Sequence, residues 1–271
     1  MVIKHIKIIT RLSILLAITL GIASYFGGFI PGTYDRDSAS MAAQGIGQDI
    51  FDLLFVVPLL LISLLLMRKG KKVALFIFGG VILYITYSFF IYSFGVYFNH
   101  LFLFYCFTLG LSFYTFILYI TALMAMDIPT WIKPRLPLRT VGIYFVVIAA
   151  MFYLLWFKDI IPAILTRTVP DDISAYHLLV NPVHVLDIAF MLPGLLITAF
   201  LLIKKQPIGL VLAPVLLVFI ILLTLALIAM VIMLNVKGIS EDISLVFIFI
   251  FLAILSSVFF FVFIKNLNYS K

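Results

Sequence analysis

The sequence predicts an all-α, polytopic integral membrane protein with about eight transmembrane helices in two parallel four-helix repeats. Three observations lead to this fold class. Hydrophobic residues make up 65% of the 271-residue chain and charged residues only 11%, and the mean hydropathy is +1.30. Long apolar runs recur along the chain, and two of them match each other position by position. A soluble domain carries about 25% charged residues, so the composition indicates a bilayer environment.

The individual spans follow from the length of the apolar runs. A transmembrane helix needs roughly 20 apolar residues, and the runs here are continuous rather than alternating, which favours helices over a transmembrane barrel. Short polar or basic stretches separate them, such as RKGKK after the second run and KKQP after the sixth. The predicted spans cover residues 12–30, 50–67, 73–95, 99–126, 139–157, 183–203, 207–235 and 243–264.

We expect one transmembrane domain over residues 1–271, with the first repeat over about 1–133 and the second over about 134–271. The basic N-terminus followed by an apolar stretch also fits a signal peptide. That stretch is long for a signal sequence and contains no A-x-A cleavage site, so we expect a retained first helix. The single cysteine, Cys106, excludes an internal disulfide and CxxC redox chemistry.

The distribution of charge predicts the orientation. If the N-terminus is cytoplasmic, the inner segments hold most of the 18 basic residues, and Asp127 is their only acidic residue. Basic residues are retained on the cytoplasmic side, so we expect a bacterial-type inner (plasma) membrane with both termini in the cytoplasm. Topology then explains the net charge of +7, and we expect the lipid bilayer, not nucleic acid, as a partner. The inner basic residues are Lys4, Lys7, Arg11, Arg68, Lys69, Lys71, Lys72, Lys133, Arg135, Arg139, Lys204, Lys205, Lys265 and Lys271.

An internal repeat relates the second and sixth spans. At an offset of 135 residues, IGQDIFDLLFVVPLLLISLLLM aligns without gaps to NPVHVLDIAFMLPGLLITAFLL, and seven of 22 positions are identical. The informative matches are Asp52 with Asp187 and Pro58 with Pro193, because each pair keeps the same six-residue spacing. Four spans per repeat is an even number, so the repeats are expected to be parallel, related by an axis along the membrane normal.

A cluster of acidic and histidine side chains is the candidate binding site. Residues three apart share a helix face, and the repeat brings two such pairs into equivalent positions near the outer surface. His100, in the predicted outer turn after the third span, is expected to join them with Asn99. An ionisable group at membrane depth is a functional candidate by default. The predicted outer-face cluster consists of Asp49, Asp52, His100, His184 and Asp187.

Two other interpretations of this cluster remain open. Carboxylates and imidazoles suit a divalent metal, with His184, Asp187 and Asp52 as candidate ligands, although no HExxH motif is present. Alternatively, the acids cap the helix N-termini through the helix dipole, and His184 simply hydrogen-bonds Asp187.

Trp131 and Trp156 fit an aromatic belt at the span ends.

The two mid-span prolines predict kinks. Pro58 and Pro193 cannot donate a backbone hydrogen bond to the carbonyls four residues earlier, at Leu54 and Ala189. Such kinks are either purely structural or border a shared vestibule.

A stripe of hydroxyl groups follows one face of the fourth span, at spacings of three and four residues. The stripe is about 21 Å long at 1.5 Å per residue. It either joins helices, as Ser and Thr often do in membranes, or lines a groove for a lipid, quinone or small substrate. The candidate groove residues are Tyr105, Thr108, Ser112, Thr115 and Tyr119.

These features lead to one preferred function and two alternatives. We expect a protein that binds or transports a small molecule or lipid through a cavity that opens outward. The first alternative is a membrane-embedded enzyme that acts on a lipid or its headgroup at the Asp and His cluster. The second is a structural or assembly protein with no site. No nucleotide-binding loop or G-x-S-x-G elbow occurs in the sequence, and no cofactor is indicated.

Overall fold

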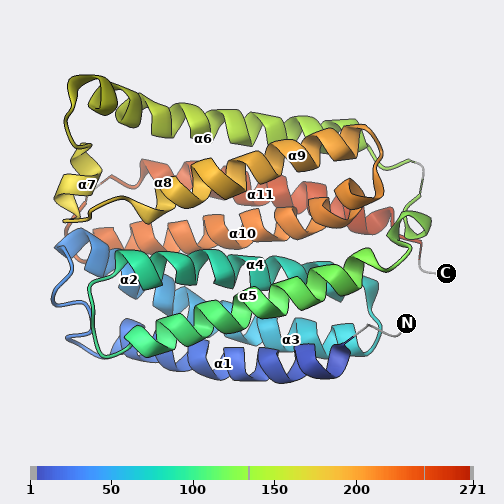
Figure 1. The fold of residues 1–271 in the computed structure, drawn as a ribbon, viewed down its shortest axis with the longest axis horizontal. Helices are drawn as coiled ribbons and strands as arrows, with labels where there is room; N and C mark the ends of the chain where they lie inside the picture. Colours follow the sequence, from blue (N-terminus) through green and yellow to red (C-terminus); the bar gives the residue numbers. More distant parts are fainter. Residues whose placement is uncertain (1–4, 134, 241, 269–271) are drawn as a thin grey trace.

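The computed structural model describes residues 5–133, 135–240 and 242–268, and this part of the chain folds entirely into helices and connecting turns (Figure 1). Eight helices in it are long and apolar enough to cross a membrane, which confirms the predicted multi-pass helical class. Lys4 and Lys271, two of the predicted inner charges, lie outside the described residues. The eight helices span Ile6–Phe29, Ala39–Arg68, Lys72–Gly95, Phe102–Met124, Leu138–Thr166, Pro182–Ile203, Pro207–Val236 and Ser244–Lys265.

Six of these helices are regular and two are interrupted by a π-helical turn. The regular ones are α1 (Ile6–Phe29), α4 (Lys72–Gly95), α5 (Phe102–Met124), α6 (Leu138–Thr166), α10 (Pro207–Val236) and α11 (Ser244–Lys265). The second span consists of α2 (Ala39–Phe51), η1 (Asp52–Val56) and α3 (Val57–Arg68). The sixth consists of α8 (Pro182–Leu186), η3 (Asp187–Met191) and α9 (Leu192–Ile203). Two short connecting helices are η2 (Ile128–Trp131) and α7 (Asp171–Ala175).

The helices run along the long axis of the molecule, and both ends of the chain lie at the same end of the bundle (Figure 1). We call this the terminal end and the other the distal end. α1 to α5 fill one half of the bundle and α6 to α11 the other (Figure 1). The halves meet where α10 packs against α2 and α4, and α4 and α10 carry the largest buried sets of side chains.

Small residues allow this central packing. A Cβ atom on Gly47 of α2 would lie 2.6 Å from the carbonyl oxygen of Ala229 on α10, and one on Gly80 of α4 would lie 2.4 Å from the Val218 Cβ. Small residues at helix contacts let backbones approach closely in a membrane, where association depends on packing. The two glycines therefore set the distance between the halves.

The second span begins earlier than the sequence predicted. The predicted span began at residue 50, but α2 starts at Ala39, where the Ser38 hydroxyl caps the helix by accepting from the Met41 N–H at 3.3 Å. The stretch from Ala39 to Gln48 is not apolar enough to register as a span, yet its alanines, methionine and glutamines are good helix formers. The fifth span is also longer than expected, because α6 continues to Thr166 instead of ending at residue 157.

The π-helical turns occupy equivalent positions in the two halves. η1 begins at Asp52 and η3 at Asp187, 135 residues apart, and α3, α9, α4 and α10 begin at the same offset. In each turn the residue before the proline donates its N–H to the aspartate carbonyl five residues earlier, Val57 to Asp52 and Leu192 to Asp187. A wider turn accommodates the proline, which cannot donate and crowds the preceding turn. This geometry explains why the aspartate and the proline are six residues apart in both halves.

Candidate functional site

Two buried carboxylates of the N-terminal half are the centre of the candidate site. Asp49 and Asp52 project from the third and fourth turns of the second span, and their side chains are 1% and 0% exposed. The first turn of α2 contains no acidic residue, so the capping interpretation is wrong for both. Burial this deep requires partners. Even a neutral polar group costs about 2–7 kcal/mol to bury without a hydrogen bond, and an isolated charge costs far more.

Tyrosines supply those partners. The Tyr84 hydroxyl on α4 donates to Asp52 Oδ1 at 2.7 Å, and Gln48 donates to the Tyr84 oxygen at 3.5 Å. The Tyr34 hydroxyl, from the turn before α2, donates to Asp49 Oδ2. Each aspartate keeps one oxygen with no hydrogen-bond partner in the described part of the chain, Oδ1 of Asp49 and Oδ2 of Asp52. These two oxygens are the unsatisfied acceptors of the site.

Aromatic rings and hydroxyls surround Asp49. The rings of Tyr92 and Tyr105 lie 5.3 Å apart, and the Phe89 ring lies 5.2 Å from Tyr92. Burial and the neighbouring Asp49 carboxylate raise the pKa of the Tyr34 hydroxyl well above its usual value of 10.0, so Tyr34 stays protonated and serves as a donor. The buried surroundings of Asp49 are therefore rich in hydroxyl groups and π faces.

The hydroxyl stripe on α5 faces inward. Tyr105, Thr108, Ser112, Thr115 and Tyr119 are all buried, while the opposite face of the helix is apolar and exposed. The face on which a groove was predicted is therefore the face of α5 that packs against α1 and α4. Tyr119 donates to the Leu75 carbonyl at 2.8 Å, which joins α5 to α4. The Thr108 and Thr115 hydroxyls have no partner among the described residues, so helix joining accounts for only part of the stripe.

A cleft opens at the distal end beside this half of the bundle. Its volume is about 380 Å³. Asn99 lies in it and donates through Nδ2 to the Thr33 carbonyl at 3.2 Å and to the Tyr105 hydroxyl at 3.3 Å. His100 also lines the cleft and packs edge-on against Phe26, so it does not join the other acidic and histidine residues. The cleft is lined by Gly32, Thr33, Asp35, Arg36, Phe98, Asn99 and His100.

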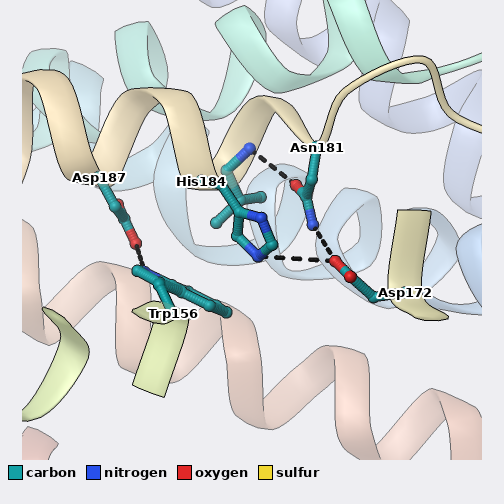
Figure 2. Close-up of polar contacts among 6 residues, drawn as sticks. Trp156, Asp172, Asn181, His184 and Asp187 are labelled. Atoms are coloured by element: carbon teal, nitrogen blue, oxygen red, sulfur yellow. Dashed lines mark hydrogen bonds and ion pairs between the residues drawn. The ribbon is translucent and has the colours of Figure 1, made fainter. Parts of the chain in front are cut away.

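The remaining two residues of the predicted cluster lie in the C-terminal half, with different partners (Figure 2). Asp187 accepts from the Tyr87 hydroxyl and from the Trp156 indole N–H, both at 2.9 Å. The His184 ring packs against Trp156 at a tilt, with the ring centroids 4.6 Å apart, and His184 pairs through Nε2 with Asp172 Oδ2 at 3.5 Å. The expected bond between His184 and Asp187 is therefore wrong, as is a purely interfacial role for Trp156.

Asn181 completes this second group. Its side-chain oxygen caps α8 by accepting from the Val183 N–H at 2.9 Å, and its amide donates to Asp172 at 2.8 Å (Figure 2). The cap of α8 is thus an asparagine, not the acids that the sequence suggested. Both oxygens of Asp187 are satisfied by protein donors, in contrast to Asp52 at the equivalent position of the other half.

The two groups have separate partners. Among the described residues, no three His, Cys, Asp or Glu side chains are gathered as ligands, and Asp52, His184 and Asp187 each have different hydrogen-bonding or ion-pair partners. Each instead belongs to a local network of tyrosine, tryptophan or carboxylate partners.

Some partners were outside the predicted set. Tyr34 lies in a loop and carries no sequence signal, whereas Tyr84 and Tyr87 stand among other tyrosines of the third span. Comparison with models of known protein families, with curated proteins and with solved structures finds no match for this chain. The geometry of the two networks is therefore the basis for assigning a function.

Proposed function

We propose that this multi-pass membrane protein binds and carries a small cationic solute in its N-terminal half, with Asp49 and Asp52 as the groups that hold it. The observation that carries the proposal is the pair of buried, unpartnered carboxylate oxygens. No lysine or arginine is fully buried in the described part of the chain to neutralise them. A buried carboxylate is expensive unless it is paired, and a cationic ligand supplies that pairing.

The aromatic surroundings support the same class of ligand. Tyrosine and phenylalanine faces attract cations within about 6 Å of the ring centroid, and Tyr34, Tyr92, Tyr105 and Phe89 are grouped beside Asp49. The buried hydroxyls of α5 continue from this group toward the terminal end of the bundle. They offer hydrogen-bonding positions along the packing face of α5.

The interrupted second span supports movement at this site. Transporters place their ligand sites where membrane helices are discontinuous, and π-helical turns are frequent at functional positions. Asp52 is the first residue of η1, directly at the interruption. Opening of the helix at this turn would expose the carboxylates to one side of the membrane.

We also propose that the two halves are parallel four-helix repeats, over about residues 1–133 and 134–271. The common offset of the π-helical turns and of the following helices supports this. Equivalent neighbours support it as well, since α3 packs on α4 as α9 packs on α10, and α4 on α5 as α10 on α11. In this scheme the first repeat holds the solute, and the second, with Asp187 fully satisfied, is the scaffold.

The proposed setting is the inner (plasma) membrane with both termini in the cytoplasm. The basic residues near the terminal end support this orientation through the positive-inside rule. The distal cleft then opens to the outside, in line with the expected outward-opening cavity.

One observation favours the alternative of an enzyme acting on a lipid headgroup. His184 and Asp172 form an acid–base pair near the distal end (Figure 2), and a histidine oriented by a carboxylate is a common general base. Replacing His184 with Ala would abolish hydrolysis of labelled phospholipid by the purified protein if this alternative were correct. Binding of cations would be unaffected.

Cation binding to the purified protein tests the preferred function. The probes are radiolabelled guanidinium, which pairs with carboxylates, and tetramethylammonium, which binds aromatic faces. We expect at least one probe to bind, and D49N and D52N to weaken it at least about ten-fold, or 1.4 kcal/mol. D187N is the matched control and should bind like the wild type.

Two results would contradict the proposal. One is the absence of binding of both probes to the wild-type protein. The other is equal binding by the wild type, D49N and D52N, which would favour a structural or assembly role.

A further inference from the structure

The distal cleft and the Asp49 carboxylate are joined by a short series of hydroxyl groups. Asn99 lies in the cleft wall and binds the Tyr105 hydroxyl at 3.3 Å. Tyr105 and Tyr92 are neighbours, and the hydroxyl of Tyr34 lies close to both. Tyr34 in turn donates to Asp49. The series therefore connects the cleft to a buried acceptor through polar side chains.

The close packing around Asp49 determines what can travel along this series. A Cβ atom on Gly27 of α1 would lie 1.9 Å from Asp49 Oδ2 and 2.6 Å from the Tyr34 oxygen. Asp49 is 1% exposed. In this closed arrangement a hydrated ion has no room beside the carboxylate. A proton needs none, because it moves along existing hydrogen bonds, and a hydroxyl is both donor and acceptor.

We propose that the distal cleft supplies protons to Asp49 through Tyr105 and Tyr34, so that a proton takes the place of the cationic solute when the solute leaves. This inference rests on the proposed function, because it assigns the exchanging ion at the same site. A carboxylate that holds either a proton or a cation couples the two fluxes in opposite directions. The protein is then a proton–cation exchanger.

The transfer is balanced. A hydronium ion that enters from the cleft beside Asn99 gives a proton to the Tyr105 oxygen and becomes water. Tyr105 passes its own hydroxyl proton to Tyr34, and Tyr34 passes its proton to Asp49 Oδ2, so the carboxylate becomes a neutral carboxylic acid. Only O–H bonds form and break, and both tyrosines end with the hydroxyl protons they need. Asn99 orients the series by occupying an acceptor position of Tyr105.

The elements around Asp49 bring few titratable side chains to it. The second span contributes Asp52, α4 contributes Tyr92, and α5 contributes Tyr105. α1 approaches with Ser24 and Gly27, which do not ionise in water. At the cleft, the charged or titratable side chains are Asp35, Arg36 and His100. Among these, Asp49 and Asp52 are the groups placed to exchange a proton for a cation.

The experiment measures proton movement driven by a cation gradient. Wild-type protein is reconstituted into liposomes that contain a pH-sensitive dye and guanidinium or tetramethylammonium, and the liposomes are diluted into cation-free buffer. We expect acidification inside as the cation leaves. Y34F and Y105F keep the aromatic rings but lose the hydroxyls, so they should slow the acidification at least about ten-fold, by more than any loss of cation binding measured for the same variants. Y87F, which removes an equally buried hydroxyl that binds Asp187 instead, should behave like the wild type.

The possible failures are distinguishable. Cation binding without acidification by the wild type, or equal acidification by the wild type, Y34F and Y105F, overturns the proton route and leaves the proposed cation site intact. Proton movement that depends on Tyr34 and Tyr105, but without binding of either cation, supports the route and contradicts the proposed solute. If Y34F does not fold, the acidification rate of Y105F alone tests the proton route, because phenylalanine keeps the ring packing of Tyr105 and removes only its hydroxyl.

Discussion

Tyr84 and Tyr87 lie three residues apart on α4, yet their hydroxyls bind aspartates in different halves of the bundle. Tyr84 donates to Asp52 at 2.7 Å and Tyr87 donates to Asp187 at 2.9 Å. Asp187 has a second donor in Trp156, whereas the other oxygen of Asp52 has no partner within the described residues. One helix therefore serves two equivalent acids that differ in how completely they are satisfied.

This difference predicts unequal effects of removing the two hydroxyls. Y84F leaves Asp52 buried with no donor, which should cost about 1–3 kcal/mol, whereas Y87F leaves the Trp156 donor in place and should cost about 0.5–1.5 kcal/mol. Reversible unfolding of each variant in mixed detergent measures the free energy of unfolding. Equal losses for the two variants would contradict the assignment of Asp52 as the less satisfied acid.

The contact between α2 and α10 predicts a steric effect at Gly47. The added methyl group of G47A would meet the Ala229 carbonyl oxygen at 2.6 Å, and overpacking of this kind costs about 1–3 kcal/mol. G21A is the control, because no atom lies within 4 Å of its Cβ position, and alanine is the better helix former. We expect a lower melting temperature in detergent for G47A only. A G47A protein as stable as G21A would show that the halves are not held this closely.

Asp37 predicts a pH dependence of stability. It lies in the turn before α2, accepts from the Tyr97 N–H at 3.1 Å, and burial raises its pKa above the ordinary value of 3.8. Since the fold favours the protonated acid, this stabilisation is fully present below pH 3.8 and is lost as the pH rises through the raised pKa. In D37N the side chain is neutral at every pH, and its amide oxygen can still accept the hydrogen bond from the Tyr97 N–H.

The test compares the melting temperatures of D37N and wild type from acidic to neutral pH. We expect D37N to gain stability relative to the wild type as the pH rises. D35N, a neighbouring acid in the same turn, is the control and should follow the wild type. A constant difference between D37N and wild type across the range would rule out this origin of the pH dependence.

The proposed orientation predicts the activity of reporter fusions. Alkaline phosphatase folds only outside the cytoplasm, so a fusion after Lys237, between α10 and α11, should be active. A fusion after Lys204, between α9 and α10, should be inactive, and green fluorescent protein at the C-terminus should fluoresce. The opposite pattern would place the termini outside and the distal cleft in the cytoplasm.

Apolar run length was enough to predict all eight spans, because the bilayer imposes a minimum length on each helix. It was not enough to locate the start of α2, since residues 39–49 are helical but not strongly apolar. Because the predicted span began at residue 50, Asp49 was interpreted as a helix cap. It lies in the third turn of a longer helix.

The partners of the acids were less predictable than the acids themselves. Asp52 and Asp187 stand out because charge is rare in a membrane segment. Which tyrosine reaches which acid depends on how α4 is rotated between the halves, and this is set by packing across the whole bundle. The His184 and Asp187 pair shows the limit: three residues apart on one helix, they nonetheless bind different neighbours.

The π-helical turn at Asp52 also changes how the faces of the second span should be compared. At about 100° per residue, a regular helix would place Asp52 and Leu64 about 120° apart around its axis. The wider turn absorbs one residue and reduces this angle to about 20°. Both side chains are indeed buried, as are Val56 and Leu60 between them at steps of four. Helical-wheel projections and alignments that assume uniform geometry will therefore assign buried positions beyond Val56 to the lipid.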